Sequence, residues 1–161
     1  MYTVDKDTRI VELNDLPAQS AGAPMPRVFA TDNDVILAYE TAPAGDDVAV
    51  LNFLRPFAHA FGPPNDEALK GHPLYGLGLK PYGNFEVFGS PWARGLERMN
   101  RVHPYHNPSR FDALRHFVFT FHDTMFECLA LDVITVGTIR NDAGSDRKLL
   151  NLIGEQLRFL L

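Results

Sequence analysis

The chain has 161 residues, of which 45% are hydrophobic and 22% charged, and these proportions predict one globular domain over residues 1–161. Its formal net charge of −5 argues against binding to nucleic acid or to anionic membrane surfaces, both of which favour basic proteins. It begins without a recognisable secretion signal, contains no apolar run near the roughly 20 residues of a membrane span, and has one cysteine, so we expect a cytoplasmic protein.

The first 26 residues are predicted to form an N-terminal arm or an edge strand. A short strand candidate, TRIVEL (8–13), is followed by LPAQSAGAPMPR (16–27), which is rich in proline, alanine and glycine and is typical of a linker. Such a short piece cannot form a second domain, so it must be attached to the domain that follows it.

Three strands are predicted between residues 27 and 54. The segments RVFAT (27–31), DVILAYET (34–41) and VAVLNFL (48–54) are rich in β-formers and are separated by short stretches of turn residues. Strands in this order with short connections predict an antiparallel meander.

The middle of the chain, residues 61–84, is predicted to be a long loop because it contains five glycines and four prolines. Long loops often form a wall of a ligand pocket, and Tyr75 and Tyr82 are therefore candidate binding residues. A short strand at FEVFG (85–89) follows the loop.

Two helices are predicted, over residues 90–103 and 146–160. The first has a good N-cap in Ser90, a proline at the first helical position and an apolar stripe; its weak point is Gly95, which costs about 1 kcal/mol relative to alanine. The second ends on RFLL, and Phe159 falls on a different side of the helix from Leu157 and Leu160. We therefore expect a homodimer through the C-terminal helix, with the neighbouring chain covering the second apolar side.

The stretch RHFVFTFHDTMFECLALDV (115–133) predicts a β-hairpin with its turn at HDTM (122–125). We expect Phe121 to lie opposite Phe126, and the alternation of side chains then divides the hairpin into two faces. The buried face is expected to carry Phe117, Phe119, Phe121, Phe126, Cys128 and Ala130. The other carries His116, Val118, Thr120 and His122 against Met125, Glu127, Leu129 and Leu131. Within the phenylalanine layer, Cys128 should be an inert buried thiol rather than a nucleophile.

The candidate catalytic residues are His122, Asp123 and Glu127 at the end of this hairpin, because a histidine beside a carboxylate can act as a general base. Candidate ligand-binding residues are His103 and His106 in the adjoining loop, with Tyr82 and Tyr75. The simpler interpretation is that these are solvated turn and helix-end residues. No sequence motif fixes three metal ligands, so we expect no metal and no cofactor.

These patterns predict an α+β fold: an antiparallel sheet of about six or seven strands, with the two helices covering one face. A partly closed β-barrel with helices is the alternative. For function, the absence of catalytic motifs favours a small binding or interaction module for a protein partner or a small ligand. The alternative is a small hydrolase- or isomerase-like enzyme that uses a His/carboxylate pair of the 115–133 hairpin.

Overall fold

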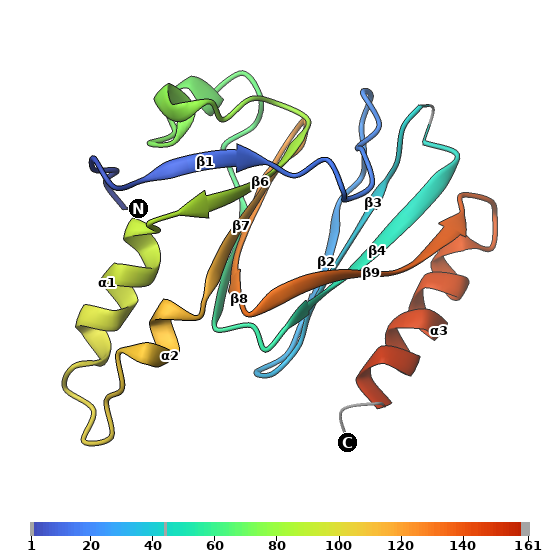
Figure 1. The fold of residues 1–161 in the computed structure, drawn as a ribbon. Coiled ribbons are helices and arrows are strands. Elements are labelled where there is room, and N and C mark those ends of the chain that lie inside the picture. The colour runs from blue at the N-terminus through green and yellow to red at the C-terminus, as the bar shows by residue number, and fades with distance from the viewer. Residues whose placement is uncertain (1, 44, 159–161) are drawn as a thin grey trace.

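The computed structural model describes residues 2–43 and 45–158, and it shows a mixed α+β fold (Figure 1). In this part of the chain the strands form two antiparallel sheets, one with the order β1-β6-β7-β8-β5 and the other with the order β2-β3-β4-β9. The strands are β1 (Arg9–Glu12), β2 (Arg27–Ala30), β3 (Val35–Glu40), β4 (Asp47–Leu54), β5 (Ala58–Gly62), β6 (Gly83–Phe88), β7 (Arg115–Thr120), β8 (Met125–Ala130) and β9 (Asp132–Arg140). The helices are α1 (Pro91–Asn100), α2 (Ser109–Asp112) and α3 (Ser145–Arg158), with 3-10 turns at Leu69–Gly71 and Tyr75–Leu77.

The α+β class is confirmed, but the prediction of a single sheet of six or seven strands is wrong. Two short connections carry the chain from one sheet to the other: residues 55–57 join β4 to β5, and Leu131 alone separates β8 from β9. Arg55 turns the first of these connections with a φ of +50°. The two sheets have separate edge strands among the described residues, so the alternative of a partly closed β-barrel is wrong as well.

The N-terminal strand candidate is an edge strand. β1 pairs antiparallel with β6, with Arg9 opposite Phe88 and Glu12 opposite Phe85. The meander predicted over residues 27–54 is also present, as β2, β3 and β4 of the four-stranded sheet.

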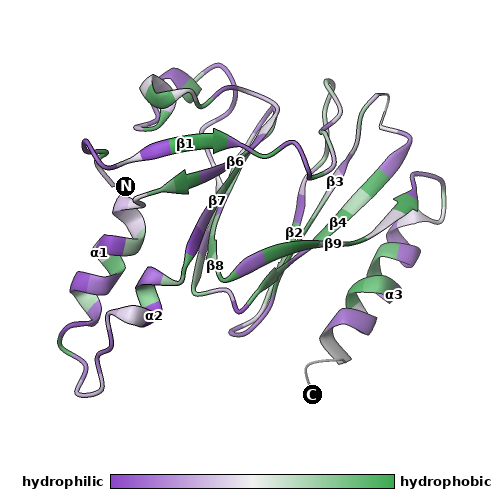
Figure 2. Ribbon diagram, in the orientation of Figure 1, coloured by the Kyte–Doolittle hydropathy of each residue, from purple (hydrophilic) through white to green (hydrophobic). Residues whose placement is uncertain are grey.

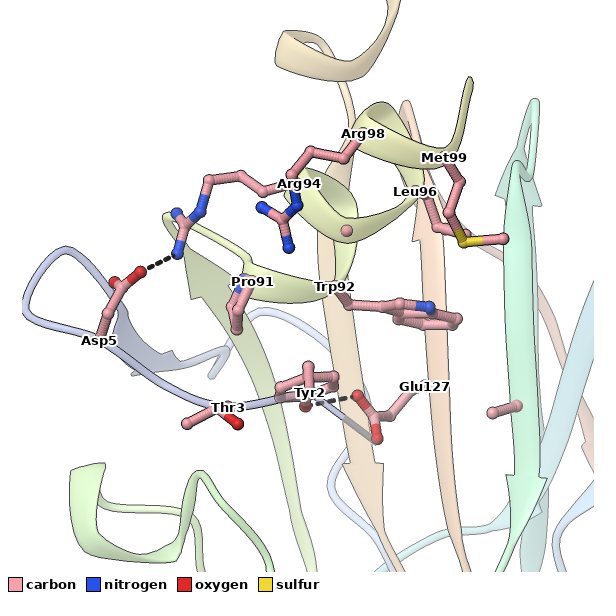
Figure 3. A pocket seen from close by; sticks show the side chains of 12 residues that line it. Tyr2, Thr3, Asp5, Pro91, Trp92, Arg94, Leu96, Arg98, Met99 and Glu127 are labelled. Carbon is pink, nitrogen blue, oxygen red and sulfur yellow. Dashed lines mark hydrogen bonds and ion pairs between the residues drawn. The ribbon is translucent and has the colours of Figure 1, made fainter. Parts of the chain in front are cut away.

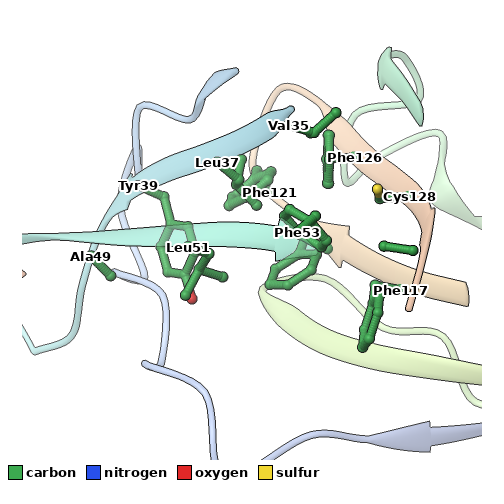
Figure 4. Close-up of a cluster of buried hydrophobic side chains, with 12 residues drawn as sticks. Val35, Leu37, Tyr39, Ala49, Leu51, Phe53, Phe117, Phe121, Phe126 and Cys128 are labelled. Atoms are coloured by element: carbon green, nitrogen blue, oxygen red, sulfur yellow. The ribbon is translucent and has the colours of Figure 1, made fainter. Parts of the chain in front are cut away.

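The main core lies between the two sheets, and aromatic rings make much of it (Figure 4). The ring centroid of Phe53 on β4 lies 5.9 Å from that of Phe119 on β7 and 5.2 Å from that of Phe126 on β8. The buried members are Val35, Leu37, Tyr39, Ala49, Leu51, Phe53, Phe117, Phe119, Phe121, Phe126, Cys128 and Ala130. Every residue that the sequence assigned to the buried face of the 115–133 hairpin is therefore in this core. Burial raises the pKa of the Cys128 thiol to about 12, as expected for an inert cysteine.

The helices cover different sheets, which corrects the prediction that they share one face. Helix α3 packs Leu149, Leu152 and Ile153 on the outer face of the four-stranded sheet. Helix α1 lies beside the five-stranded sheet, where the Trp92 ring is 5.3 Å from the ring of His116 on β7. Both faces of β3 are thus covered, which explains why all of Val35–Tyr39 is buried. The same cover explains why β3 and β4, the central strands of this sheet, are apolar over much of their length (Figure 2).

No helix in the described part of the chain is both long and apolar enough to cross a lipid bilayer.

Candidate functional site

The register of the β7–β8 hairpin decides which side chains meet at its polar face. Phe119, not Phe121, lies opposite Phe126, and the turn is closed by a hydrogen bond from the Phe121 amide to the Thr124 carbonyl. This register differs from the predicted one by two residues, so every side chain keeps its predicted face but changes its partner. Glu127 faces Val118 and has His116, rather than His122, as its diagonal neighbour.

Glu127 is the centre of a buried polar cluster on the outer face of the five-stranded sheet. Its Oε2 accepts a hydrogen bond from the Tyr2 hydroxyl at 2.7 Å and lies 2.8 Å from Nε2 of His116. Its Oε1 lies 3.4 Å from Nε2 of His72. The Glu127 side chain is only 12% exposed and that of His116 is fully buried. Three segments far apart in sequence therefore supply donors to one carboxylate.

The hydrogen-bond partners show which ring nitrogen of each histidine faces Glu127. Nδ1 of His72 accepts the amide N–H of Leu74, so the ring proton is on Nε2 and points to Glu127. Nδ1 of His116 lies 3.0 Å from Oγ of Ser90. That oxygen also accepts the Ala93 amide as the N-cap of α1. Each imidazole therefore directs its Nε2 at the same carboxylate.

The pKa of Glu127 is set by opposing effects. Burial alone would raise it, but the hydrogen bonds from His116 and His72, the charge interaction with His116 and the hydrogen bond from Tyr2 outweigh burial and lower the pKa to about 2. Burial, followed by the neighbouring carboxylate, raises the pKa of Tyr2 above its usual range. The cluster therefore holds an ionised glutamate and an un-ionised tyrosine at neutral pH.

Glu127 and Tyr2 lie at the base of a cavity of about 610 Å³, called here the Glu127 cavity (Figure 3). This volume falls in the range of small-molecule sites. Helix α1 forms one wall, and Figure 3 shows its side chains on the opposite side of the space from Tyr2 and Glu127. The apolar part of the lining consists of Ala60, Pro91, Trp92, Leu96 and Met99.

The predicted pairing of His122 with Glu127 does not occur. Nδ1 of His122 lies 3.0 Å from Oδ2 of Asp66 and 2.8 Å from the Tyr82 hydroxyl, and the His122 side chain is 48% exposed. Asp123 is 80% exposed, with its Oδ1 3.9 Å from Nε2 of His122. Three of the candidates therefore meet, as His122, Tyr82 and Asp123, but they do so on the surface and without Glu127.

The remaining candidates are also apart from the Glu127 cavity. His106 is bonded to α1, with Nε2 3.0 Å from Oε1 of Glu97 and Nδ1 3.0 Å from Oδ1 of Asn100. His103 is exposed and its Nδ1 accepts the amide N–H of Tyr105. Tyr75 is 38% exposed in a 3-10 turn. Both loop histidines thus make local contacts at the end of α1.

Sequence reasoning missed His116, His72, Tyr2 and Ser90 as members of a site. A signal was available for His116, because the strand alternation placed it on the same face as Glu127. His72 lies on the long loop that was expected to form a wall of a ligand pocket, but no pattern linked it or Tyr2 to Glu127.

The described residues contain no group of three or more His, Cys, Asp or Glu side chains arranged to hold a metal ion. Comparison with protein-family models, with curated proteins and with solved structures finds no match to this chain.

Proposed function

We propose that this chain is a small-ligand-binding module whose ligand occupies the Glu127 cavity. The observation that carries the proposal is a buried, ionised carboxylate held by three side-chain donors at the base of a cavity of about 610 Å³. Ligand sites typically combine an apolar wall with a few fixed polar groups, and the Glu127 cavity has both. This deepens the binding-module prediction by giving the module a place to bind.

Binding is favoured over catalysis by the state of the polar groups. A carboxyl group with a pKa of about 2 is a weak base at neutral pH. His116 is fully buried, so a proton that it accepted could leave only through its two bonded partners. The cluster therefore fixes the base of the cavity rather than exchanging protons with a substrate.

The cavity can be tested with Trp92, because it is the only tryptophan of the chain and lines the cavity. We expect decanol, used as an apolar probe, to change the Trp92 emission of the wild type in a saturable titration. Gly95→Leu should abolish that change, because Gly95 also lines the cavity and a leucine would fill part of it while still favouring a helix. Lys148→Leu, the same new side chain on exposed α3, is the control. An equal response from wild type and Gly95→Leu would contradict the proposal.

A small hydrolase is the second candidate, and the hydrogen-bond order Ser90–His116–Glu127 is the observation that favours it. A hydroxyl hydrogen-bonded to an imidazole, whose other nitrogen is hydrogen-bonded to a carboxylate, is the order of a catalytic triad. It ranks second because Ser90 is buried and already caps α1. Covalent labelling of Ser90 by a fluorophosphonate, lost in Ser90→Ala, would favour the hydrolase over the binding module.

We also propose that the module is cytoplasmic and forms a two-fold dimer through α3. The single cysteine supports a reducing compartment. The dimer was predicted from Leu157, Phe159 and Leu160, whose side chains lie outside the described residues. A described residue also supports it: Leu150 on α3 is 57% exposed, although the neighbouring Leu149 is buried against the sheet.

Light scattering at micromolar concentration tests the dimer. We expect the wild type to have twice the chain mass of 18.0 kDa, and Leu150→Asp to have the mass of one chain, because the substitution places a charge in the apolar contact. Lys148→Asp, which also adds an acidic residue to α3, is the matched control and should remain dimeric. A wild type of 18.0 kDa would refute the dimer.

A further inference from the structure

We infer that the ligand of the Glu127 cavity is an apolar organic anion whose acidic group is bound by Arg98. This inference rests on the proposed function, because it names the chemical class of the ligand for the same cavity. It follows from the charged groups of the lining, from the position of Arg98 and from the apolar wall.

Most charged groups of the lining are already engaged by the protein. Arg94 donates from Nη2 to Oδ2 of Asp5 at 2.6 Å and from Nη1 to the carbonyl of Gly89 at 2.7 Å. Glu127 accepts from its own three donors. Arg98, in contrast, lines the cavity without a side-chain hydrogen bond or an ion pair to any described residue. Its guanidinium therefore offers an uncompensated positive charge and free N–H donors to a ligand.

The Arg98 side chain is directed back along α1 toward the cavity. Its Nη2 would lie 3.9 Å from a Cβ atom placed on Gly95, one turn earlier in the helix. Figure 3 shows its guanidinium beside that of Arg94, over the space bounded by Pro91, Trp92 and Tyr2. A glycine in the middle of a helix lowers the stability of that helix. Gly95 lines the cavity, and its lack of a side chain leaves space beneath Arg98.

The rest of the lining requires that the ligand have an apolar body. Trp92, Leu96 and Met99 form a continuous helical side of the cavity, and Met99 is 71% exposed. Covering such side chains removes apolar surface from water and stabilises the complex. A second charged group on the ligand would lie at the base of the cavity. It would find no free partner there, because the donors and acceptors of the base are already bonded to one another. One acidic group beside Arg98 and an uncharged apolar remainder fit this arrangement.

Three amphiphiles with the same tail test the inference through Trp92 emission: decanoate, decanol and decyltrimethylammonium, each below its micelle concentration. We expect decanoate to bind about tenfold more tightly than decanol, a modest gain because Arg98 is exposed to solvent. Arg98→Gln should reduce the decanoate affinity to that of decanol and leave decanol unchanged. Arg110→Gln, the same substitution at an exposed arginine outside the lining, should change neither.

The outcomes separate the inference from the function on which it rests. If decanol binding is lost in Gly95→Leu but Arg98→Gln leaves decanoate unchanged, the inference of an anionic ligand is wrong and the cavity proposal stands. Tighter binding of decyltrimethylammonium than of decanoate would also overturn the inference. If none of the three amphiphiles changes the emission of Trp92, the proposed function is wrong and the inference fails with it.

Discussion

Replacing Phe119 with alanine is expected to lower the free energy of unfolding by about 3–5 kcal/mol, because it opens a cavity in the middle of the main core. The Phe119 side chain is fully buried between the sheets, with its ring centroid 5.9 Å from Phe53, 6.1 Å from Phe126 and 6.2 Å from Tyr39. These three neighbours come from β3, β4 and β8, so collapse around the missing ring would require both sheets to move. Urea denaturation followed by circular dichroism measures the loss.

Two control variants separate burial from the mere loss of an aromatic ring. Phe61→Ala makes the same substitution on β5 at a residue that is 44% exposed, and it should lower the free energy of unfolding by much less than Phe119→Ala. His122→Ala removes a half-exposed ring on the polar face of the same hairpin and should change stability by less than about 1 kcal/mol. A larger loss from His122→Ala than from Phe119→Ala would show that the faces of β7 are assigned the wrong way round.

The faces of the hairpin could be predicted from the sequence, whereas the partners across it could not. Side-chain alternation is a property of one strand, so Phe117, Phe119 and Phe121 share a face in every register. The register depends on how many residues form the turn. The predicted register was wrong by two residues, and a shift by two leaves each side chain on its predicted face. The error nevertheless changed the neighbour of Glu127: the predicted register placed it beside the exposed His122, whereas the structure places it beside the buried His116. The predicted contact between His122 and Glu127 was therefore wrong, although every face was right.

The division into two sheets was also not visible in the sequence. β4 and β5 are separated by only three residues, and β8 and β9 by one, which is as short as a connection within a single sheet. β3 and β4 are buried on both faces, as β7 and β8 are, and for β3 and β4 this burial depends on α3 and on the second sheet, both encoded elsewhere in the chain. Tyr2 and His72 were missed for the same reason, since their contact with Glu127 is long-range and has no local pattern.

Replacing Glu127 with glutamine is expected to lower the free energy of unfolding at pH 7 by about 2–4 kcal/mol. The carboxylate accepts from Tyr2 and His116 on one oxygen and faces the Nε2–H of His72 with the other. A glutamine has one carbonyl oxygen and one NH₂ group, so at least one buried donor would face another donor. His72 cannot easily resolve this conflict by moving its proton, because its Nδ1 accepts the Leu74 amide.

The same cluster predicts a specific pH dependence of stability. The pKa of Glu127 is lowered from 4.5 to about 2 in the folded protein. The unfolded chain therefore binds a proton at a higher pH than the folded chain does. The resulting stabilisation is present above about pH 4.5 and is lost as the pH falls toward 2. A difference of this size corresponds to about 3 kcal/mol.

Urea denaturation at a series of pH values between 7 and 2.5 tests this prediction, with Glu127→Gln beside the wild type. The variant should be less stable at pH 7, and the difference from wild type should shrink as the pH falls below about 4.5, because protonation of Glu127 removes the same carboxylate that the substitution removes. Glu155→Gln, at an exposed position on α3, controls for the general effect of acid, and its stability should change with pH in parallel with that of the wild type.

A constant difference in stability between wild type and Glu127→Gln over the whole pH range would mean that Glu127 titrates normally in the folded protein. In that case Tyr2, His72 and His116 would not stabilise its charge, and the polar base of the Glu127 cavity would have to be explained without an ionised carboxylate.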